Sequence, residues 1–567
     1  MADWLNPAWV YLAAALLLPL VRHGSARATL LVLVPIVAAL PLLLSPYGNY
    51  GEVTLMNETL TLFRLDRLSF VFALIFSLAA FLALLYAWHV RDTMQQVATL
   101  IYAGSAIGAT LAGDLVTLFL WWEGTAISSV FLIWARRTEG AYHTGMRYLV
   151  VQIGSGVILL GGLSVHYAET GSLAFDALSL QGIGAWIILF AIAIKCAFPV
   201  LHNWLQDAYP AATVTGTVVL SAFTTKLAVY ALARGYAGTD FLIPIGATMT
   251  LFPIFYAVIE NDLRRVLTYS LNNQLGFMVV GVGVGSELAI NGAAAHAFSH
   301  ILYKALLFMS VGAVLFRTGT AKGSELGGLY KTMPLTMVFC VIGAASISAF
   351  PLFSGFISKS MILSAAAQEG YLVTWLILLF ASAGVFHHSG IKIPYFAFFA
   401  HDSGKRPAEA PWNMLLAMGL TAFLCIAIGV YPGALYSILP FDVTYSPYTT
   451  THVITQVQLL WFSALAFGTL MFTGIYPPEL KSTNLDTDWS YRRFAPAVIG
   501  FAARIASVSW YEASRGLGFA RQAATDTLER FFGPKGRAAR TLPTGQMVLW
   551  LAILLCAALA VNLLDVR

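Results

Sequence analysis

The stretch KCAFPVLHNWLQDAYP, from Lys195 to Pro210, decides how this chain folds. It begins inside an apolar run, Ile183 to Val200, that is long enough to enter a membrane, yet it contains a lysine and then Pro199. Proline removes a backbone donor and clashes with the preceding turn, so we expect the helix to break between Cys196 and Pro199. A broken helix with a lysine beside the break is typical of ion sites at mid-depth in membrane proteins.

The composition of the chain is that of a polytopic membrane protein, because 59% of its 567 residues are hydrophobic and 10% are charged. The first apolar segment has no basic leader, so we interpret it as a permanent span and not as a removed signal. The four cysteines all lie in apolar runs, and we predict neither disulfides nor a metal site. Loop lysines and arginines explain the net charge of +5, so no nucleic-acid partner is predicted.

Sixteen apolar segments have about the length of a membrane span. They lie near residues 7–21, 28–46, 68–90, 97–112, 114–135, 146–168, 181–206, 213–234, 241–260, 266–286, 289–316, 333–363, 371–400, 412–438, 455–475 and 546–564. When the N-terminus is placed outside, the short basic loops fall on the cytoplasmic side and the acidic loops on the other. This bias predicts that both termini lie on the periplasmic side of a bacterial inner membrane.

A polar segment, residues 476–545, separates the last two spans and contains ten lysines and arginines, the first of them Lys481. Apolar residues recur in it at spacings of three and four, as Phe494, Val498, Phe501, Ile505 and Val508. This pattern predicts a basic amphipathic helix that lies along the cytoplasmic membrane surface or against a neighbouring subunit. A solvated linker with one or two amphipathic turns is the alternative.

Five charged residues are set among apolar residues in five separate spans. They are Glu123, Lys195, Lys226, Lys304 and Lys359. Each charge at the centre of a membrane helix costs about 2.5–3.5 kcal/mol on insertion scales, so a structural anchor has little reason to carry them. Burial disfavours the charged form of a lysine and a nearby carboxylate favours it. We therefore predict a proton relay along a polar axis, gated by movement between Glu123 and Lys195; a static ion pair of these two residues is the alternative.

Histidines extend this predicted relay, because His296, His300 and Lys304 recur every four residues and share one helix face. Histidine titrates near neutral pH, so two histidines that lead to a lysine are suited to proton transfer. Two rival interpretations are a metal site, since this spacing suits metal ligands, and two histidines that serve only helix packing. No carboxylate or cysteine stands nearby in sequence to complete a metal site.

Two further groups of polar residues interrupt apolar spans. Asn272 and Asn273 can hold water between the two halves of the chain, or hydrogen-bond between helices. His387, His388 and Lys392 resemble an entry or exit near the cytoplasmic face, although Lys392 is close enough to a loop for its side chain to reach the membrane surface instead.

An internal echo links the two halves of the chain. Ala197-Phe198-Pro199-Val200 recurs as Ala349-Phe350-Pro351-Leu352, and in both copies a lysine stands near the proline. Paired interrupted segments of this kind are typical of repeated halves with one site in each half.

The ordered motifs resemble the antiporter-like family shared by Mrp-type cation/proton antiporters, the membrane arm of respiratory complex I and membrane-bound hydrogenases. The resemblance covers about residues 60–475, and its motifs are WWEG with Glu123, KCAFPVLHNWLQDA with Lys195, TKLAVYALAR with Lys226, NDLRRVLTYSLNNQLG, HAFSHILYKALLF with Lys304 and FPLFSGFISK with Lys359. Within the family, the chain is most similar to the D subunits of Mrp-type antiporters. It departs at Leu271, Asn272 and Asn273, where the family has a serine-rich stretch, and at Tyr209, where a histidine is expected.

The resemblance implies two inverted five-helix repeats, each with one broken helix. The sixteen apolar segments predict an all-α membrane protein of about sixteen transmembrane helices, more than the ordinary D subunit has. We accordingly divide the chain into N-terminal helices (1–96), a first repeat (97–234), a second repeat (241–400), a C-terminal helix pair (411–475), the amphipathic segment (476–545) and a final span (546–567).

The resemblance also implies a function. We expect a transporter subunit without a cofactor, not an enzyme, that moves protons in a multi-subunit Na+/H+ antiporter and binds the other subunits of that complex and the lipid bilayer. A proton-pumping arm of a redox complex and a proton-conducting subunit of a bicarbonate-uptake complex are the alternatives.

Overall fold

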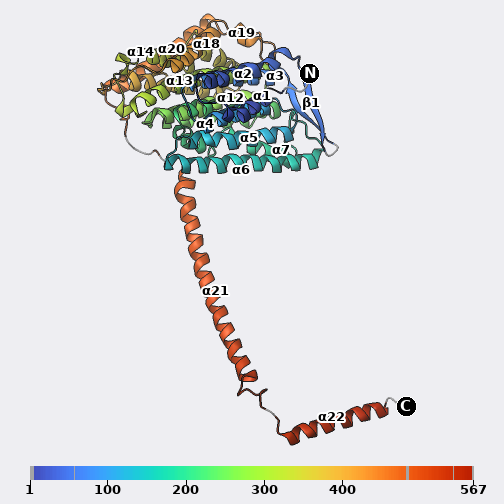
Figure 1. Cartoon of the computed structure of the whole chain (residues 1–567). Coiled ribbons are helices and arrows are strands. Elements are labelled where there is room, and N and C mark those ends of the chain that lie inside the picture. The colour runs from blue at the N-terminus through green and yellow to red at the C-terminus, as the bar shows by residue number, and fades with distance from the viewer. Residues whose placement is uncertain (1–5, 56–57, 481–483, 485, 541, 565–567) are drawn as a thin grey trace. The chain divides into compact units, whose positions relative to one another are not determined.

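Helices make up most of the protein (Figure 1), which we describe from a computed structural model for residues 6–55, 58–480, 484, 486–540 and 542–564. The chain forms two compact units, Met1–Asn484 and Leu485–Arg567. In the described part, twelve helices are long and apolar enough to cross a membrane. Lys481 and both chain ends, which the sequence analysis assigned to a basic segment and to the periplasmic side, lie outside the described residues.

The N-terminal part of the first unit contains three long helices and a hairpin. Its elements are α1 (Pro7–Leu17), η1 (Leu18–Leu20), α2 (Ser25–Leu44), β1 (Gly48–Leu55), β2 (Glu58–Leu65) and α3 (Arg67–Tyr86). Two sets of helices follow. The first set is α4 (Thr93–Thr110), α5 (Leu115–Trp134), α6 (Glu139–Thr170), α7 (Ile183–Lys195), α8 (Asn203–Ala211), α9 (Val214–Ala222) and α10 (Thr224–Gly235).

The second set and the C-terminal helices complete the chain. The second set is α11 (Leu242–Ile259), α12 (Leu263–Val284), α13 (Glu287–Thr318), η2 (Gly323–Glu325), η3 (Leu329–Lys331), α14 (Pro334–Ile347), α15 (Ser354–Gln368), α16 (Leu372–Val385), η4 (Phe386–Ile391), α17 (Lys392–Pro394) and η5 (Tyr395–Phe399). After it come α18 (Trp412–Val430), α19 (Gly433–Tyr436) and α20 (Thr450–Phe472), and the second unit has η6 (Ser490–Phe494), α21 (Ala495–Phe532) and α22 (Thr544–Leu564).

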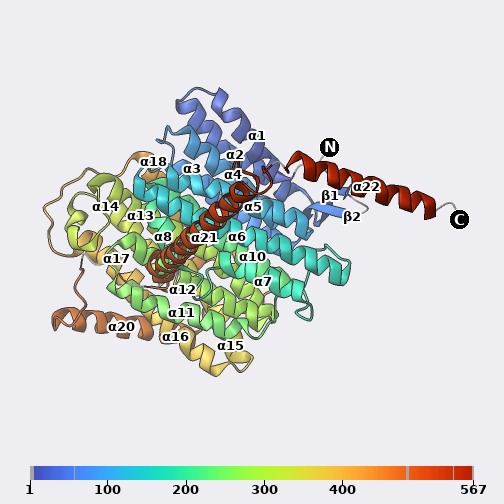
Figure 2. The same cartoon turned by 90° about the horizontal axis from the view of Figure 1, so that it is seen from below.

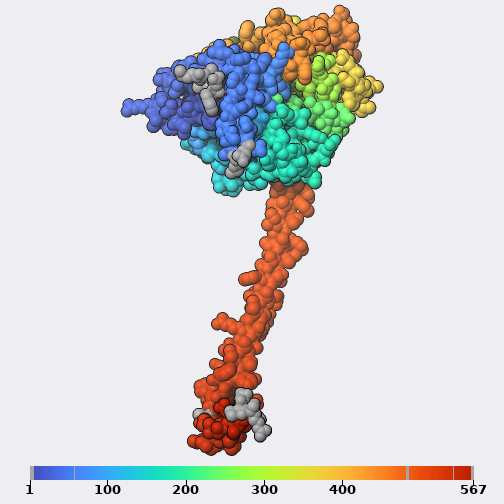
Figure 3. All heavy atoms as spheres, turned by 90° about the vertical axis from the view of Figure 1, so that its right-hand side faces the viewer, coloured from blue at the N-terminus to red at the C-terminus, as the bar shows by residue number. Residues whose placement is uncertain are grey.

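The β-hairpin corrects the prediction of an all-helical protein. Strands β1 and β2 pair antiparallel, with Gly48 opposite Leu65. In β2 threonines and leucines alternate from Thr59 to Leu62, a period of two that favours a strand. Leu60, Phe63 and Leu65 of this strand are buried. A search for spans of about 20 residues passes over segments this short. The hairpin lies on the face of the first unit that Figure 3 turns towards the viewer.

The break after Lys195 is confirmed, and the second copy of the echo has the same backbone conformation. Helix α7 ends at Lys195 and α8 begins at Asn203. The first and fourth residues of the two tetrapeptides all have left-handed backbones: Ala197 (φ 59°), Val200 (φ 73°), Ala349 (φ 57°) and Leu352 (φ 73°). The amide of the second residue bonds back in each copy as well, over 3.1 Å in the first and 3.0 Å in the second. A shared strained geometry is stronger evidence of repetition than a shared tetrapeptide.

The two helix sets match in other respects. Helices α4 and α11 each have 18 residues, and α6 and α13 each have 32. Both long helices end at a left-handed glycine, Gly171 or Gly319. Aspartates begin α5 and α12 by accepting backbone hydrogen bonds from the first turn. Each of these aspartates, Asp114 and Asp262, also forms an isolated bridge to the loop after the long helix of its set.

The centre of the first unit is formed by the helices that carry most of the predicted relay. The most apolar part of α13 is 94% buried and that of Val214–Gly235 is completely buried. Helices α5, α6 and α7 lie side by side (Figure 1), and α11 packs against both α12 and α16 (Figure 2). The lysines and the α13 histidines of the predicted relay are therefore buried, whereas Glu123 is partly exposed.

The second unit contains one continuous helix where the sequence predicted an amphipathic segment. Helix α21 has 38 residues, which contradicts the alternative of a linker with one or two helical turns. It follows the short η6, which ends at Phe494. Helix α22 lies at the predicted final span.

The strain at the first break makes a stability prediction. A non-glycine residue in the left-handed region costs about 1–2 kcal/mol, and Val200 is β-branched but 71% exposed, so its side chain contributes little burial. We expect Val200→Gly to raise the thermal unfolding midpoint of the detergent-solubilised protein, by up to about 1 kcal/mol in stability after the entropy cost of glycine. Val373→Gly is the control, because Val373 is 72% exposed in the regular helix α16 and its replacement should lower the midpoint. Equal losses in both variants would contradict the assignment of strain.

Candidate functional site

Lys195, the last residue of α7, reaches into α5 and not onto a carboxylate. Its Nζ donates to the Trp122 carbonyl oxygen over 2.6 Å and to the Thr125 hydroxyl over 2.9 Å, and it lies 4.4 Å from the centre of the Trp122 ring. The side chain is completely buried. Within the described residues, Glu123 forms no ion pair and its Oε1 has no hydrogen-bond partner. The static ion pair of Glu123 and Lys195 is therefore absent.

Glycine makes room for the Glu123 carboxylate. A side chain at Gly156 of α6 would overlap Glu123 Oε1. Gly156 occupies in α6 the position that Lys304 occupies in α13, the helix of equal length in the second set. The first set thus places a carboxylate where the second set places an ammonium group. Glu123 itself is half-buried, so it lies at the edge of the first unit while the lysines lie inside it.

Lys226 and Lys359 each bind the end of a helix. Lys226 Nζ donates over 2.6 Å to the Ser221 carbonyl oxygen, in the last turn of α9 before the kink at Phe223. Lys359 Nζ donates over 3.0 Å to the Ile347 carbonyl oxygen, the last residue of α14 before the second break. Carbonyl groups at helix ends have no intrahelical donor, so the lysines supply one.

Lys304 begins a chain of hydrogen bonds that crosses three elements. Its Nζ donates to Ser270 Oγ over 2.9 Å and to a second acceptor in α12, the Leu267 carbonyl oxygen, over 3.3 Å. Ser389 of η4 donates to the same Ser270 Oγ over 2.8 Å, and Ser389 Oγ lies 2.8 Å from His388 Nδ1. All of these polar side chains are buried. This series of hydrogen bonds connects Lys304 of α13 to His388 of η4 without a gap.

The two histidines of α13 differ in their contacts. Their rings lie 6.2 Å apart and nearly parallel. His296 Nδ1 lies 3.1 Å from Ser358 Oγ and its Nε2 lies 3.4 Å from the Tyr303 hydroxyl, which donates to Gln274. His300 is completely buried, and neither ring nitrogen has a partner among the described residues. Buried polar groups of this kind need water or another donor.

The two asparagines of α12 also differ. Asn273 donates to the Thr250 carbonyl oxygen of α11 and accepts from Gln274 over 2.6 Å. Asn272 is completely buried, and both polar atoms of its side chain lack a partner among the described residues. Asn273 therefore joins two helices, as one interpretation expected, and Asn272 is suited to hold water.

Lys392 does not reach the membrane surface, which corrects the alternative given for it. Its side chain has no exposed area and its Nζ lies 3.0 Å from the Glu479 carboxylate. It also donates to three carbonyl oxygens at the end of α11, of Ala257, Val258 and Glu260. His387 is separate from this group, since its ring packs on Phe467 and Tyr476.

Glu479 is a site residue that the sequence analysis did not identify. It lies beyond α20 in the segment YPPEL, where a glutamate next to prolines resembles an ordinary loop residue. One signal in the sequence could have indicated it: the span that contains Lys392 has no acidic residue to pair with this lysine. Glu479 also lines a pocket of about 360 Å³ together with Ser324 and His401. Burial raises the pKa of its carboxyl group, against the opposing effect of the Lys392 charge.

The four central lysines share one chemical environment. Lys195, Lys226, Lys304 and Lys359 are buried, donate to carbonyl and hydroxyl oxygens, and form no ion pair with any carboxylate that the structure describes. Carbonyl and hydroxyl dipoles therefore contribute to the stabilisation of their charges.

Comparisons with known proteins find a matching family model and curated relatives. Residues 112–386 match the model of the protein family described as "NADH:quinone oxidoreductase/Mrp antiporter, TM". The chain is 32% identical over 316 residues to the D subunit of the Na(+)/H(+) antiporter of Alkalihalophilus pseudofirmus, an alignment that covers 52% of this chain and 64% of the relative. The chain spans between 40% and 64% of the length of the curated relatives that it matches.

Two solved structures have the same fold. An archaeal membrane-bound sulfane sulfur reductase contains a chain with a TM-score of 0.71 and 22% identity, which covers 98% of this chain and 99% of its own length. The Mrp complex from Dietzia sp. DQ12-45-1b contains one with a TM-score of 0.68 and 20% identity, which covers 84% of this chain and 98% of its own length.

The pair of Lys392 and Glu479 makes a stability prediction. Removing one partner of a buried ion pair leaves an uncompensated charge, at a cost of about 3–5 kcal/mol. We expect Glu479→Gln to lower the thermal midpoint of the solubilised protein strongly, and Glu479→Gln combined with Lys392→Met to recover part of the loss.

Asp402→Asn is the matched control. Asp402 pairs with Arg406 and Lys331 but is 41% exposed, so this change should lower the thermal midpoint only slightly. A Glu479→Gln loss no larger than the Asp402→Asn loss would show that the buried pair is not structural.

Proposed function

We propose that this chain is the proton-translocating subunit of a multi-subunit Mrp-type Na+/H+ antiporter, because its residues 112–386 match the model of the NADH:quinone oxidoreductase/Mrp antiporter family. The observation that carries the proposal is the set of four buried lysines without carboxylate partners. A donor for a helix end does not have to be charged, and each charge without a carboxylate partner in the membrane costs free energy. A subunit that transfers protons needs such groups.

The proposed path begins at Glu123 and Lys195. When the carboxylate approaches the ammonium group, Lys195 holds its proton more strongly, and when it withdraws, Lys195 releases it. Lys226 follows at the kink between α9 and α10, and its proton passes to the face of α13 formed by His296, His300 and Lys304. Water at the unpartnered nitrogens of His300 and at Asn272 would join these groups.

The hydrogen bonds favour one of two ends for this path. Lys359 is one possible exit, and it contacts Ile347 and the ring of Phe277. The unbroken chain from Lys304 instead runs through Ser270 and Ser389 to His388. Lys392 is four residues beyond His388, and its partner Glu479 lines a pocket. We therefore place the exit at His388, Lys392 and Glu479. We assign to Lys359 the role of changing, through its charge, how readily His296 and His300 bind a proton.

The proposal includes an arrangement in the membrane. The matching helix sets support two inverted five-helix repeats, residues 97–234 and 241–400, between N-terminal helices (1–96) and a C-terminal pair (411–475). Sixteen spans, with both termini in the periplasm of a bacterial inner membrane, satisfy the charge bias of the loops. The amphipathic segment 476–545 and the final span 546–567 would contact other subunits of the complex, of the kinds named Mrp A, B, C, E, F and G.

A proton-pumping arm of a redox complex is the second candidate. It is favoured by one observation: the sulfane sulfur reductase chain covers 98% of this chain, whereas the Mrp chain covers 84%. In such a complex electron transfer in a partner, and not a sodium gradient, would drive the same relay.

A flux measurement tests the proposed function. Inside-out vesicles that contain the complete native complex receive a sodium gradient, and proton movement is followed with a pH-sensitive dye. We expect Lys195→Met to reduce sodium-driven proton flux on the order of a hundredfold, the typical contribution of one positioned proton-transfer group. Lys322→Met, which removes an exposed lysine, should leave the flux unchanged.

Assembly of each variant complex is checked by co-purification of the other subunits. Wild-type proton flux in an assembled Lys195→Met complex would contradict the proposed relay. Proton flux that responds to an electron donor and not to sodium would assign the chain to the redox class.

The same vesicles distinguish the two exits. Ser389→Ala breaks the hydrogen-bond chain between Ser270 and His388, so we expect the flux to fall several-fold. Ser382→Ala is the control, because Ser382 is also buried in the same span but its hydroxyl has no partner among the described residues. Full flux in Ser389→Ala together with lost flux in Lys359→Met would move the exit to Lys359.

A further inference from the structure

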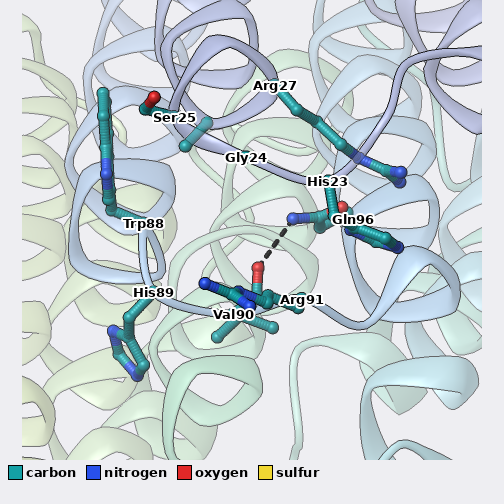
Figure 4. A pocket seen from close by; sticks show the side chains of 10 residues that line it. His23, Gly24, Ser25, Arg27, Trp88, His89, Val90, Arg91 and Gln96 are labelled. Atoms are coloured by element: carbon teal, nitrogen blue, oxygen red, sulfur yellow. Dashed lines mark hydrogen bonds between the residues drawn. The ribbon is translucent and has the colours of Figure 1, made fainter.

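A pocket outside the proposed proton path lies where α2 begins and where α3 passes into α4. It has a volume of about 290 Å³. Figure 4 shows residues 23–27 on one side of it and residues 88–91 on the other. Its ten lining residues include Arg27, Arg91, His23 and His89, and none of the ten is acidic. The pocket is therefore suited to an anion.

Arg27 is fixed at the wall of this pocket. It is 2% exposed, and its guanidinium group donates to the Val21 carbonyl oxygen over 3.0 Å and to the Thr93 hydroxyl over 3.1 Å. Its Nε is buried and has no partner among the described residues. No carboxylate that the structure describes pairs with Arg27, so its charge is uncompensated. Holding a guanidinium group in this way is costly unless an anion completes the site.

Two further features add positive potential. The 20-residue helix α2 begins in the pocket at Ser25, and no side chain caps its first turn. Free amides and the helix dipole at such an end attract anions. Arg91, from the loop after α3, is exposed and forms no ion pair with a described residue. It can therefore turn towards a bound anion.

An apolar track leaves the pocket along α2. The residues Leu30, Leu33, Val37, Leu40 and Leu44 recur every three or four positions, and each is between 38% and 78% exposed in the first unit. The track begins one turn beyond Arg27 and extends to the end of the helix. A ligand with a charged head and long hydrocarbon chains fits both features, whereas a free anion uses only the first.

We propose that this pocket binds the headgroup of an anionic glycerophospholipid, with its phosphate on Arg27, Arg91 and the first turn of α2 and its acyl chains along the apolar face of α2. A hydroxyl group of the headgroup, as in phosphatidylglycerol, is the donor for Gln96 Oε1. This oxygen is buried without a partner among the described residues, while the amide nitrogen of the same side chain donates to the Val90 carbonyl oxygen over 2.8 Å (Figure 4). The site anchors α2 to α3 and α4 and is independent of proton transfer.

Native mass spectrometry of the delipidated complete complex tests this site. Dioleoylphosphatidylglycerol and dioleoylphosphatidylcholine are titrated separately, and the dissociation constant of the first bound lipid is measured. Arg91→Gln removes one phosphate contact without disturbing a protein contact. We expect it to weaken phosphatidylglycerol binding about fivefold, the effect of one basic side chain near a lipid headgroup. Phosphatidylcholine binding should be weaker in the wild type and should fall less, because the choline cation next to its phosphate opposes the attraction to arginine.

Arg22→Gln is the matched control, because Arg22 is an exposed arginine of the loop before α2 that does not line the pocket. Its phosphatidylglycerol affinity should equal that of wild type. Arg27→Gln, if the complex assembles, should weaken the lipid more than Arg91→Gln does. Equal losses in Arg91→Gln and Arg22→Gln would show general surface attraction and overturn the site.

Inorganic phosphate separates the two possible sources of the anion. At millimolar concentration it should fail to displace phosphatidylglycerol, because it cannot use the apolar track. Displacement by phosphate, with equal binding of both lipids, would overturn the lipid assignment. The readout is binding, so the result does not depend on whether the complex moves protons.

Discussion

A backbone carbonyl group that loses its helical donor inside a membrane must find another donor, because lipid supplies none. This constraint shapes the centre of the molecule. The breaks after α7 and α14 and the kink after α9 interrupt helices in the interior of the first unit. Lysines supply the missing donor at two of these interruptions, since Lys226 donates to the end of α9 and Lys359 donates to the end of α14. The same contact stabilises the irregular backbone and holds a proton-bearing group in place. Structure and proposed function therefore depend on one interaction.

The two helix sets have matching backbones but carry different charged residues. Their backbones agree closely, down to the left-handed residues at both breaks. Their charges do not agree. Glu123 lies against Gly156 in the first set, and Lys304 takes the place of that glycine in the second. Glu123 thus has its carboxylate beside Gly156, and Glu479 pairs with Lys392. In the proposed path these two acids mark the points of entry and release.

The sequence predicted most of the helices and the buried lysines, because long apolar runs that carry isolated charges are characteristic of membrane spans with functional groups. It predicted the break after Lys195 because proline has a local effect on the backbone. The hairpin was missed, since its signal is a short alternation beside strong helical runs. Contacts between distant segments were missed too. Ser270 meets Ser389, and Lys392 meets Glu479, through packing of elements that no local pattern connects. The absence of the Glu123–Lys195 ion pair also depends on packing, because Thr125 and the Trp122 carbonyl take its place.

The central claim is that water joins the buried lysines through the polar groups that have no protein partner. A high-resolution cryo-electron microscopy map of the complete complex tests it most directly. The account predicts ordered water within hydrogen-bond distance of both ring nitrogens of His300 and of the Asn272 amide, in continuous contact with Lys226 and Lys304. A map in which aliphatic side chains fill this space and no water lies between the lysines would contradict it.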